Sequence, residues 1–155
     1  MARTHKNGSS KYEHFTKLCR PMMQTDAWRA LSPKAQALYP WLRLEWKGAN
    51  NNNNGKIRLS YRQAARCMGI TPNTAGEAFH ELQAKGFIVV TQLGALGVEG
   101  QARGHSYELT ELSIRNERPR CLYKKWNPDA EFEVVRVKPN NPNGYRKKQN
   151  PVENI

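Results

Sequence analysis

Two stretches of the chain carry apolar residues three and four positions apart, the spacing that gives a helix one buried face. The first spans residues 33–47, and its apolar positions are Ala35, Leu38, Tyr39, Leu42 and Trp46. The second spans residues 71–85, and its apolar positions are Ala75, Ala78, Phe79 and Leu82. Both stretches are predicted to be amphipathic helices, and Pro40 is expected either to kink the first one or to cost it a hydrogen bond.

A residue suited to cap a helix stands before each of four predicted helices, namely Thr25, Ser32, Ser60 and Thr71. Proline follows the second and the fourth of these residues, and proline favours the first helical turn. The third has the capping-box spacing with Gln63, and Gly69 suits the end of the short helix that it opens. The first would cap a short helix over residues 26–31.

Strand patterns are shorter and lie between and after these helices. Residues 56–59 alternate polar and apolar positions, and residues 87–92 are rich in β-branched and aromatic residues. Residues 106–109 are predicted to form the strand that pairs with residues 87–92. The last two are joined by residues 93–105, which contain four glycines and predict a hairpin with a long loop. The asparagine run at residues 50–54 predicts an exposed loop.

The order of these elements predicts an α+β fold, a winged helix-turn-helix with a three-helix core, a small antiparallel sheet and a glycine-rich wing. The domain is expected to cover residues 25–110. A basic arm, residues 1–24, would precede it, and a basic, largely extended tail, residues 111–155, would follow it. Within that tail only residues 132–137 favour a strand, and the polar composition of its end predicts partial disorder.

The amino-acid composition indicates a polyanionic partner for this predicted fold. The 155 residues carry a net charge of +12 with a pI of about 9.9, and only 38% of them are hydrophobic. The charge is spread, because residues 1–24, 25–109 and 110–155 each have a net charge of +4. Such an excess attracts nucleic acid first and an anionic membrane surface second.

The helices over residues 60–69 and 71–85 form the predicted helix-turn-helix, whose second helix would enter the major groove of duplex DNA. At the start of that helix Asn73 can pair with adenine, and Thr74 can contact thymine or phosphate. Arg62 lies where a phosphate would be met. The residues expected to contact DNA are Lys56, Arg58, Tyr61, Arg62, Thr71, Asn73, Thr74, Glu77, His80, Lys85, Arg103 and His105. Lys147 and Lys148 in the tail would add attraction that does not depend on base sequence.

The sequence contains no motif that is typical of another class of function. The four histidines and three cysteines lack the spacing of metal ligands, and no cofactor-binding or catalytic signature is present, so neither a metal, a cofactor nor an enzyme is expected. The three separated cysteines favour reduced thiols and a cytoplasmic protein. No apolar run has the length of a membrane span, and no secretory signal is expected at the start.

Several motifs resemble those of winged-helix proteins from bacterial plasmids, prophages and alphaproteobacterial genomes. These motifs are Phe15-Thr16-Lys17-Leu18, Ala27-Trp28-Arg29-Ala30-Leu31-Ser32, Ala37-Leu38-Tyr39, the stretch Leu59–Ile88 and the tail Lys147-Lys148-Gln149-Asn150-Pro151-Val152. Some of those proteins are similar to the DNA-binding domains of plasmid replication initiators and phage replication proteins. The resemblance implies a transcription regulator or a replication-associated factor. The pair Gly76-Glu77 departs from the pattern, because related proteins more often place a basic residue there.

The acidic residues of the predicted DNA-reading helix also support a second hypothesis. Glu77 and Glu81 would repel phosphate if both pointed outward from this helix. The same surface could then hold a protein, either a second copy of this chain or a replication or transcription factor. The sequence therefore leaves open a DNA-binding protein and a protein-interaction module.

Overall fold

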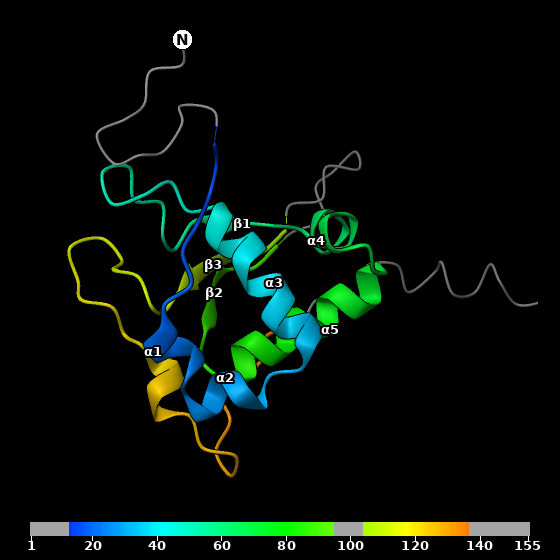
Figure 1. The fold of residues 1–155 in the computed structure, drawn as a ribbon. Helices are drawn as coiled ribbons and strands as arrows, with labels where there is room; N and C mark the ends of the chain where they lie inside the picture. The colour runs from blue at the N-terminus through cyan, green and yellow to red at the C-terminus, as the bar shows by residue number, and fades with distance from the viewer. Residues whose placement is uncertain (1–12, 95–103, 137–155) are drawn as a thin grey trace, which may run out of the picture.

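The computed structural model of the chain describes residues 13–94 and 104–136. These residues form an α+β fold, and its element order is compatible with a winged helix. In chain order, the described elements are α1 (Arg20–Met23), α2 (Asp26–Ala30), α3 (Pro33–Leu44), β1 (Ile57–Arg58), α4 (Tyr61–Met68), α5 (Pro72–Ala84), β2 (Ile88–Gln92), β3 (Ser106–Leu109) and the 3₁₀ helix η2 (Leu122–Lys125). Figure 1 shows α3, α4 and α5 grouped beside the small sheet.

The predicted helix starts are confirmed. The hydroxyl oxygen of each capping residue accepts a hydrogen bond from the backbone N–H three positions later, and these residues are Thr25, Ser32, Ser60 and Thr71. Both halves of the capping box between Ser60 and Gln63 are present. Gly69 ends α4 with φ at 69°, a left-handed conformation that glycine adopts without steric penalty. Local sequence thus sets where these four helices begin.

Helix α3 ends at Leu44, before the predicted end at Lys47. The asparagine-rich loop that follows provides the reason. The amide nitrogen of Asn53 donates to the carbonyl of Glu45 at 3.0 Å, and its side-chain oxygen accepts the N–H of Lys47 at 2.8 Å. These bonds satisfy backbone groups that a longer helix would have used, so the chain leaves the helix there.

The sheet has three antiparallel strands in the order β1-β3-β2. Ile57 pairs with Tyr107, and Ile88 pairs with Leu109. All four side chains are buried. The predicted strand over residues 87–92 begins one residue later than expected. Since β1 and β2 flank β3, the hairpin is closed on one side by the strand that precedes α4.

An aromatic cluster fills the space between the helices and the sheet. The rings of Phe79 on α5 and Tyr107 on β3 stack with centroids 5.2 Å apart. Phe87 meets the rings of Trp28 and Tyr39 edge to face, at 5.6 Å and 5.8 Å. All five side chains are buried, so the apolar spacing of α3 and α5 converges on one core.

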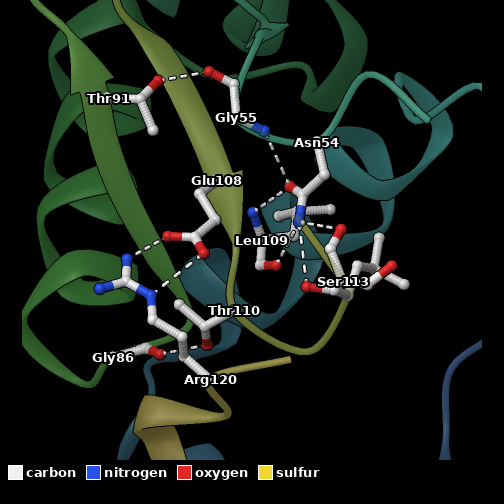
Figure 2. A network of polar contacts seen from close by, with 10 residues as sticks. Asn54, Gly55, Gly86, Thr91, Glu108, Leu109, Thr110, Ser113 and Arg120 are labelled. Carbon is white, nitrogen blue, oxygen red and sulfur yellow. Dashed lines mark hydrogen bonds and ion pairs between the residues drawn. The ribbon is translucent and has the colours of Figure 1, made fainter. Parts of the chain in front are cut away.

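Asn54 ties the loop before β1 to β3 and to the turn that follows it (Figure 2). Its side-chain oxygen accepts the N–H of Leu109 at 2.7 Å, and its amide nitrogen donates to the carbonyl of Leu109 at 2.9 Å. The same nitrogen lies 3.1 Å from the carbonyl oxygens of Leu112 and Ser113. The exposed loop predicted for residues 50–54 is therefore wrong at its last residue, where these bonds offset the cost of burying an amide.

Residues 111–136 pack on the sheet and on α5, whereas the sequence predicts an extended tail from residue 111. Tyr123 is buried, and its ring stacks on Phe87 with centroids 4.9 Å apart and planes 3° apart. The guanidinium of Arg120 pairs with the buried carboxylate of Glu108 (Figure 2). These contacts involve single residues at irregular spacing, so no periodic pattern in the sequence predicts them.

The strand expected over residues 132–137 is not formed by its described part, residues 132–136. The N–H of Phe132 donates to the carbonyl of Ala84 at 2.9 Å, and the N–H of Val135 donates to the side-chain oxygen of Gln83 at 2.8 Å. The backbone of this segment therefore bonds to α5 and not to a neighbouring strand.

Candidate nucleic-acid interface

Helix α5 buries the face that its apolar spacing predicts. Four side chains on that face are fully buried: Ala75, Ala78, Phe79 and Leu82. On the opposite side Asn73 and Glu77 are exposed, and His80 and Ala84 are half-buried. Because successive helical residues are about 100° apart, these last four form one stripe, which we call the exposed face of α5 (Asn73, Glu77, His80 and Ala84).

The start of α3 engages both acidic side chains of α5. The carboxylate of Glu81 accepts the N–H of Ser32 at 2.8 Å and its hydroxyl at 2.7 Å. The ammonium of Lys34 lies 2.5 Å from the carboxylate of Glu77, and this hydrogen bond lowers the pKa of Glu77 and raises that of Lys34. Glu81 therefore does not join the outward face expected from the sequence, and a lysine balances the charge of Glu77.

Tyr61, at the start of α4, lies against α5 at the point where that helix has a glycine. A Cβ added to Gly76 would lie 3.0 Å from the Tyr61 ring, which is tighter than most real contacts. The same ring packs on Phe79 with centroids 4.9 Å apart. Burial raises the pKa of Tyr61. The lack of a side chain at Gly76 thus lets the Tyr61 ring lie against α5.

The hydrogen bonds of His80 link Tyr61 to the end of the described chain. A guanidinium only donates, so Nδ1 of His80, 3.2 Å from Nη1 of Arg136, accepts. The neutral ring then carries its proton on Nε2, which donates towards the Tyr61 hydroxyl at 3.4 Å. Burial first, and then the charge of Arg136, lower the pKa of His80 and favour this neutral form. The hydroxyl proton of Tyr61 is consequently directed to an acceptor other than His80.

The start of α4 lies beside the base of the long hairpin loop. A Cβ on Gly104 would lie 3.8 Å from Ser60, the residue that caps α4. Arg62 and Arg66 are exposed one helical turn apart on α4, which places their charges on one side of that helix. The first turn of α4 and the hairpin base thus stand next to each other, as a phosphate-binding edge would require.

Two further predicted residues lie on β1. Lys56 and Arg58 are exposed, while the intervening Ile57 is buried. The Nε of Arg58 donates to the hydroxyl of Ser106 at 3.3 Å, which holds its side chain across β3. Both residues therefore add positive charge to the strand that leads into α4.

His105 does not present its ring to solvent, and its predicted role as a DNA contact is wrong. It is 5% exposed, and Nδ1 accepts the N–H of Gly94 at 2.7 Å. Burial also lowers its pKa. The ring closes the base of the hairpin loop, because this is where the chain leaves β2 and returns to β3.

Three other predicted contacts are engaged within the protein. Lys85 pairs with Glu131 at 3.1 Å and lies over the ring of Trp126 at 5.4 Å, so it belongs to the packing of the C-terminal segment. The hydroxyl of Thr71 caps Thr74, and the two hydroxyl oxygens are 2.9 Å apart. Their first role is therefore to hold the start of α5.

The remaining predicted contacts fall outside the residues that the structure describes. Arg103 precedes the return strand of the hairpin, and Lys147 and Lys148 lie beyond residue 136. By contrast, Lys34 and Arg136 adjoin the exposed face of α5 and were not among the predicted contacts. Neither has a local signal, because both reach α5 through the fold from distant parts of the chain.

Comparison with known proteins returned nothing: no protein-family profile, curated protein or solved structure matches the chain. Among residues 13–94 and 104–136, no helix combines the length and apolarity needed to cross a membrane. In that same part of the chain, no three His, Cys, Asp or Glu side chains gather as metal ligands would.

Proposed function

We propose that the chain is a winged helix that binds duplex DNA, with α5 in the major groove and the β2–β3 hairpin as the wing. The observation that carries this proposal is the position of the two acidic residues of α5. Glu81 caps α3 and Glu77 is paired with Lys34, so the exposed face does not present two unbalanced carboxylates to phosphate. The net charge of +12 then acts on a surface that DNA can approach.

The residues around α5 divide into two roles. Asn73, exposed in the first turn of α5, is the candidate for reading a base edge, where an asparagine pairs best with adenine. Arg62, Arg66 and the hydroxyl of Tyr61 stand at the start of α4 and would meet phosphates. Since the phosphate contacts outnumber the base contact, binding is semi-specific, with most of the affinity from the backbone.

The resemblance to plasmid and phage winged-helix proteins supports a biological role of the same kind. The chain would act without catalysis, as a transcription regulator or a replication-associated factor of a mobile element. It requires no cofactor for this role, since all the contacts come from its own side chains. A homodimer would be indicated by a palindromic binding site.

A salt titration tests the DNA-binding proposal. The full chain should bind random-sequence duplex with an affinity that falls steeply as salt rises, and Arg62→Glu with Arg66→Glu should reduce the slope of log affinity against log salt by about two. Arg115→Glu with Arg118→Glu, a change at two exposed arginines of the 111–120 loop on the other side of the molecule in Figure 1, is the matched control. Absence of duplex binding by the natural chain at low salt would refute the proposal.

Selection of bound sequences from a random duplex pool tests the base contact. If Asn73 reads a base, Asn73→Ala should relax the preference at one base pair and leave the salt slope unchanged. If the natural chain selects no sequence, the base-reading role of Asn73 is refuted, but the proposed binding to the DNA backbone is not.

A protein-docking role is the second candidate. Large apolar side chains are exposed at Phe15 (66%) and Leu18 (39%) before α1 and at Trp41 (37%) on α3. Such groups suit a partner surface more than a phosphate backbone. Replacing Phe15 and Trp41 by serine should then abolish self-association or partner binding without changing duplex affinity, as measured by sedimentation and anisotropy.

A further inference from the structure

A groove of about 470 Å³ lies between the first described residues and the end of α3. One wall is the segment 14–17, which Figure 1 shows in blue beside the end of that helix. The other wall comes from residues between 43 and 48, at the end of α3 and just after it. The groove therefore forms only when these two separate parts of the chain meet in the folded protein.

Each wall contributes one aromatic ring, Phe15 from the first segment and Trp46 from the second. Phe15 is exposed, whereas Trp46 is half-buried. The indole is held in place, because its Nε1 donates to the side-chain oxygen of Asn52 at 2.9 Å and the guanidinium carbon of Arg43 lies 5.5 Å from its ring centroid. A flat ring that enters the groove would thus meet an indole that is already fixed.

Arg43 forms a buried part of the second wall. Its side chain is only 3% exposed, and its Nε lies 2.7 Å from the carboxylate of Glu111. The same carboxylate accepts the hydroxyl of Tyr39, and Glu111 does not line the groove. The ion pair therefore anchors the guanidinium beside Trp46 and balances the charge of Glu111 outside the groove.

The charged side chains that line the groove are all basic among the residues that the structure describes. Lys17 and Lys47 are exposed on opposite walls, and His14 is exposed beside the first. The acidic neighbours in sequence, Glu13 and Glu45, do not line it. A cation at Lys47 suits the C-terminal end of α3, but that dipole gives no reason for Lys17 on the other wall. The groove would therefore attract an anionic group from both sides.

We propose that this groove binds single-stranded nucleic acid, with a base stacked on Phe15 and Trp46 and its flanking phosphates at Lys17 and Lys47. Aromatic rings within a positively charged groove are the arrangement that holds unpaired nucleotides with little sequence preference. The exposure of Phe15 and both lysines suits a strand that passes through the groove, since a small-molecule site buries most of its ligand. A duplex is excluded from this contact, because its bases are already stacked on one another.

This site is separate from the exposed face of α5. Lys34, which pairs with Glu77 of that face, stands nine positions before Arg43 on α3. Nine helical positions correspond to about 14 Å along the helix axis. Single-strand binding at the groove thus does not depend on duplex binding by α5, and the two affinities can be measured separately.

Anisotropy of a labelled oligothymidylate of about twelve nucleotides, titrated with the full chain, tests the aromatic contact. Phe15→Ala should weaken this binding at least about fivefold and leave duplex affinity unchanged. Trp41→Ala, which removes an exposed ring of α3 that does not line the groove, is the matched control and should change neither affinity. The same titration with oligouridylate distinguishes DNA from RNA as the source of the strand.

A salt titration tests the two lysines. Lys17→Gln with Lys47→Gln should reduce the slope of log affinity against log salt for oligothymidylate by about 1.4, since each phosphate contact to a single strand contributes about 0.7. Lys124→Gln with Lys125→Gln removes the same charge from two exposed lysines of η2. This control should leave the slope nearly unchanged.

Trp46 supplies a direct readout of stacking, because a base that stacks on an indole quenches its fluorescence. Unlabelled oligothymidylate should quench the natural chain and the Trp41→Phe variant to the same extent, and the Trp46→Phe variant much less. If Trp46→Phe does not fold, the comparison of Phe15→Ala with Trp41→Ala still decides the matter, since both of those side chains are exposed.

Three results would overturn the inference. The natural chain could fail to bind either oligonucleotide at low salt, or the groove variants could lose no more affinity than their controls. Thymidine monophosphate could also quench Trp46 at the same concentration as the oligomer, which would indicate a small-molecule site. A chain that binds duplex but neither oligonucleotide would retain the proposed function alone, whereas a chain that binds only the oligonucleotide would retain this inference alone.

Discussion

At the scale of single residues, Gly76 shows how a helix position can be set by its neighbour. Alanine is more favourable than glycine inside a helix by about 1 kcal/mol. At this position, however, the new methyl group would meet the ring of Tyr61, which is itself held by Phe79 and His80. The steric contact therefore opposes the gain in helix propensity.

A double-mutant cycle measures this opposition. Gly76→Ala should bring no increase in the free energy of unfolding in the natural chain, whereas in a Tyr61→Ala background it should stabilise by about 1 kcal/mol. Urea denaturation of the four proteins gives both values. Equal effects in the two backgrounds would mean that the Tyr61 ring yields to the methyl group.

Two histidines make stability depend on pH. Burial lowers the pKa of His105, and burial together with Arg136 lowers that of His80, although Glu77 acts in the opposite direction on His80 and His105 adds a small lowering effect. A folded pKa below the unfolded value of about 6.5 means that the unfolded chain binds more protons in the window between the two. Their contribution is therefore fully present above about pH 6.5 and is lost as the pH falls through the folded values.

The expected measurement is a lower urea midpoint at pH 5 than at pH 7.5. His105→Asn and His80→Gln should each reduce this difference, since neither replacement titrates. His14→Gln, at an exposed histidine near the start of the described chain, serves as the control and should leave the difference unchanged. A pH difference that persists undiminished in the double variant of His80 and His105 would assign it to other groups.

At the scale of elements, the sequence predicts the helices well because their signals are local. The caps at Ser60 and Thr71, the left-handed Gly69 and the apolar spacing of α5 each depend on residues within a few positions of one another. The C-terminal end of α3 and the burial of Asn54 depend on bonds to the asparagine loop and to β3. The hydrogen bonds of a loop asparagine to a strand produce no periodic pattern in the sequence.

The same reason explains which parts of the candidate interface were foreseen. The outward position of Asn73 and the exposure of Arg62 follow from helical spacing and capping. The burial of His105, and the approach of Lys34 and Arg136 to α5, follow from how separate elements meet. Those contacts depend on tertiary packing, which single-chain patterns do not encode.

Removing the Asn54 side chain tests its role between elements. Asn54→Ala would leave the buried N–H of Leu109 without its side-chain partner, whereas the carbonyl of Leu109 would keep the backbone N–H of Leu112, 3.1 Å away. An unmet buried N–H costs about 1–3 kcal/mol, so a loss of that size in the free energy of unfolding is expected. Asn51→Ala, at an exposed position of the same run, should change it by less than about 0.5 kcal/mol.

At the scale of the whole molecule, the folded unit includes residues 111–136. A chain that stops at residue 110 would lose the Tyr123 stack on Phe87 and would leave Glu108, which is 1% exposed, without Arg120. Breaking a buried ion pair from one side typically costs about 3–5 kcal/mol, a large part of the stability of a small domain.

Two truncated chains make this a direct comparison. A chain of residues 1–136 should melt cooperatively by circular dichroism, while a chain of residues 1–110 should show no cooperative transition at the same temperature and pH. A cooperative transition of normal size in the shorter chain would show that residues 111–136 are accessory to the folded unit.

The bonds of Asn54 also bear on how the protein ages. Asparagine followed by glycine is the pair most prone to lose ammonia, because the small glycine lets its backbone nitrogen attack the side-chain carbonyl. In the folded chain the amide nitrogen of Asn54 is held by three backbone carbonyls, so departure of ammonia requires the loop and β3 to separate. The carboxylate left behind would face those same oxygens and hinder their return. The fraction of Asn54 that is deamidated, measured by mass spectrometry, would thus report how much time the protein spends with this loop separated from β3.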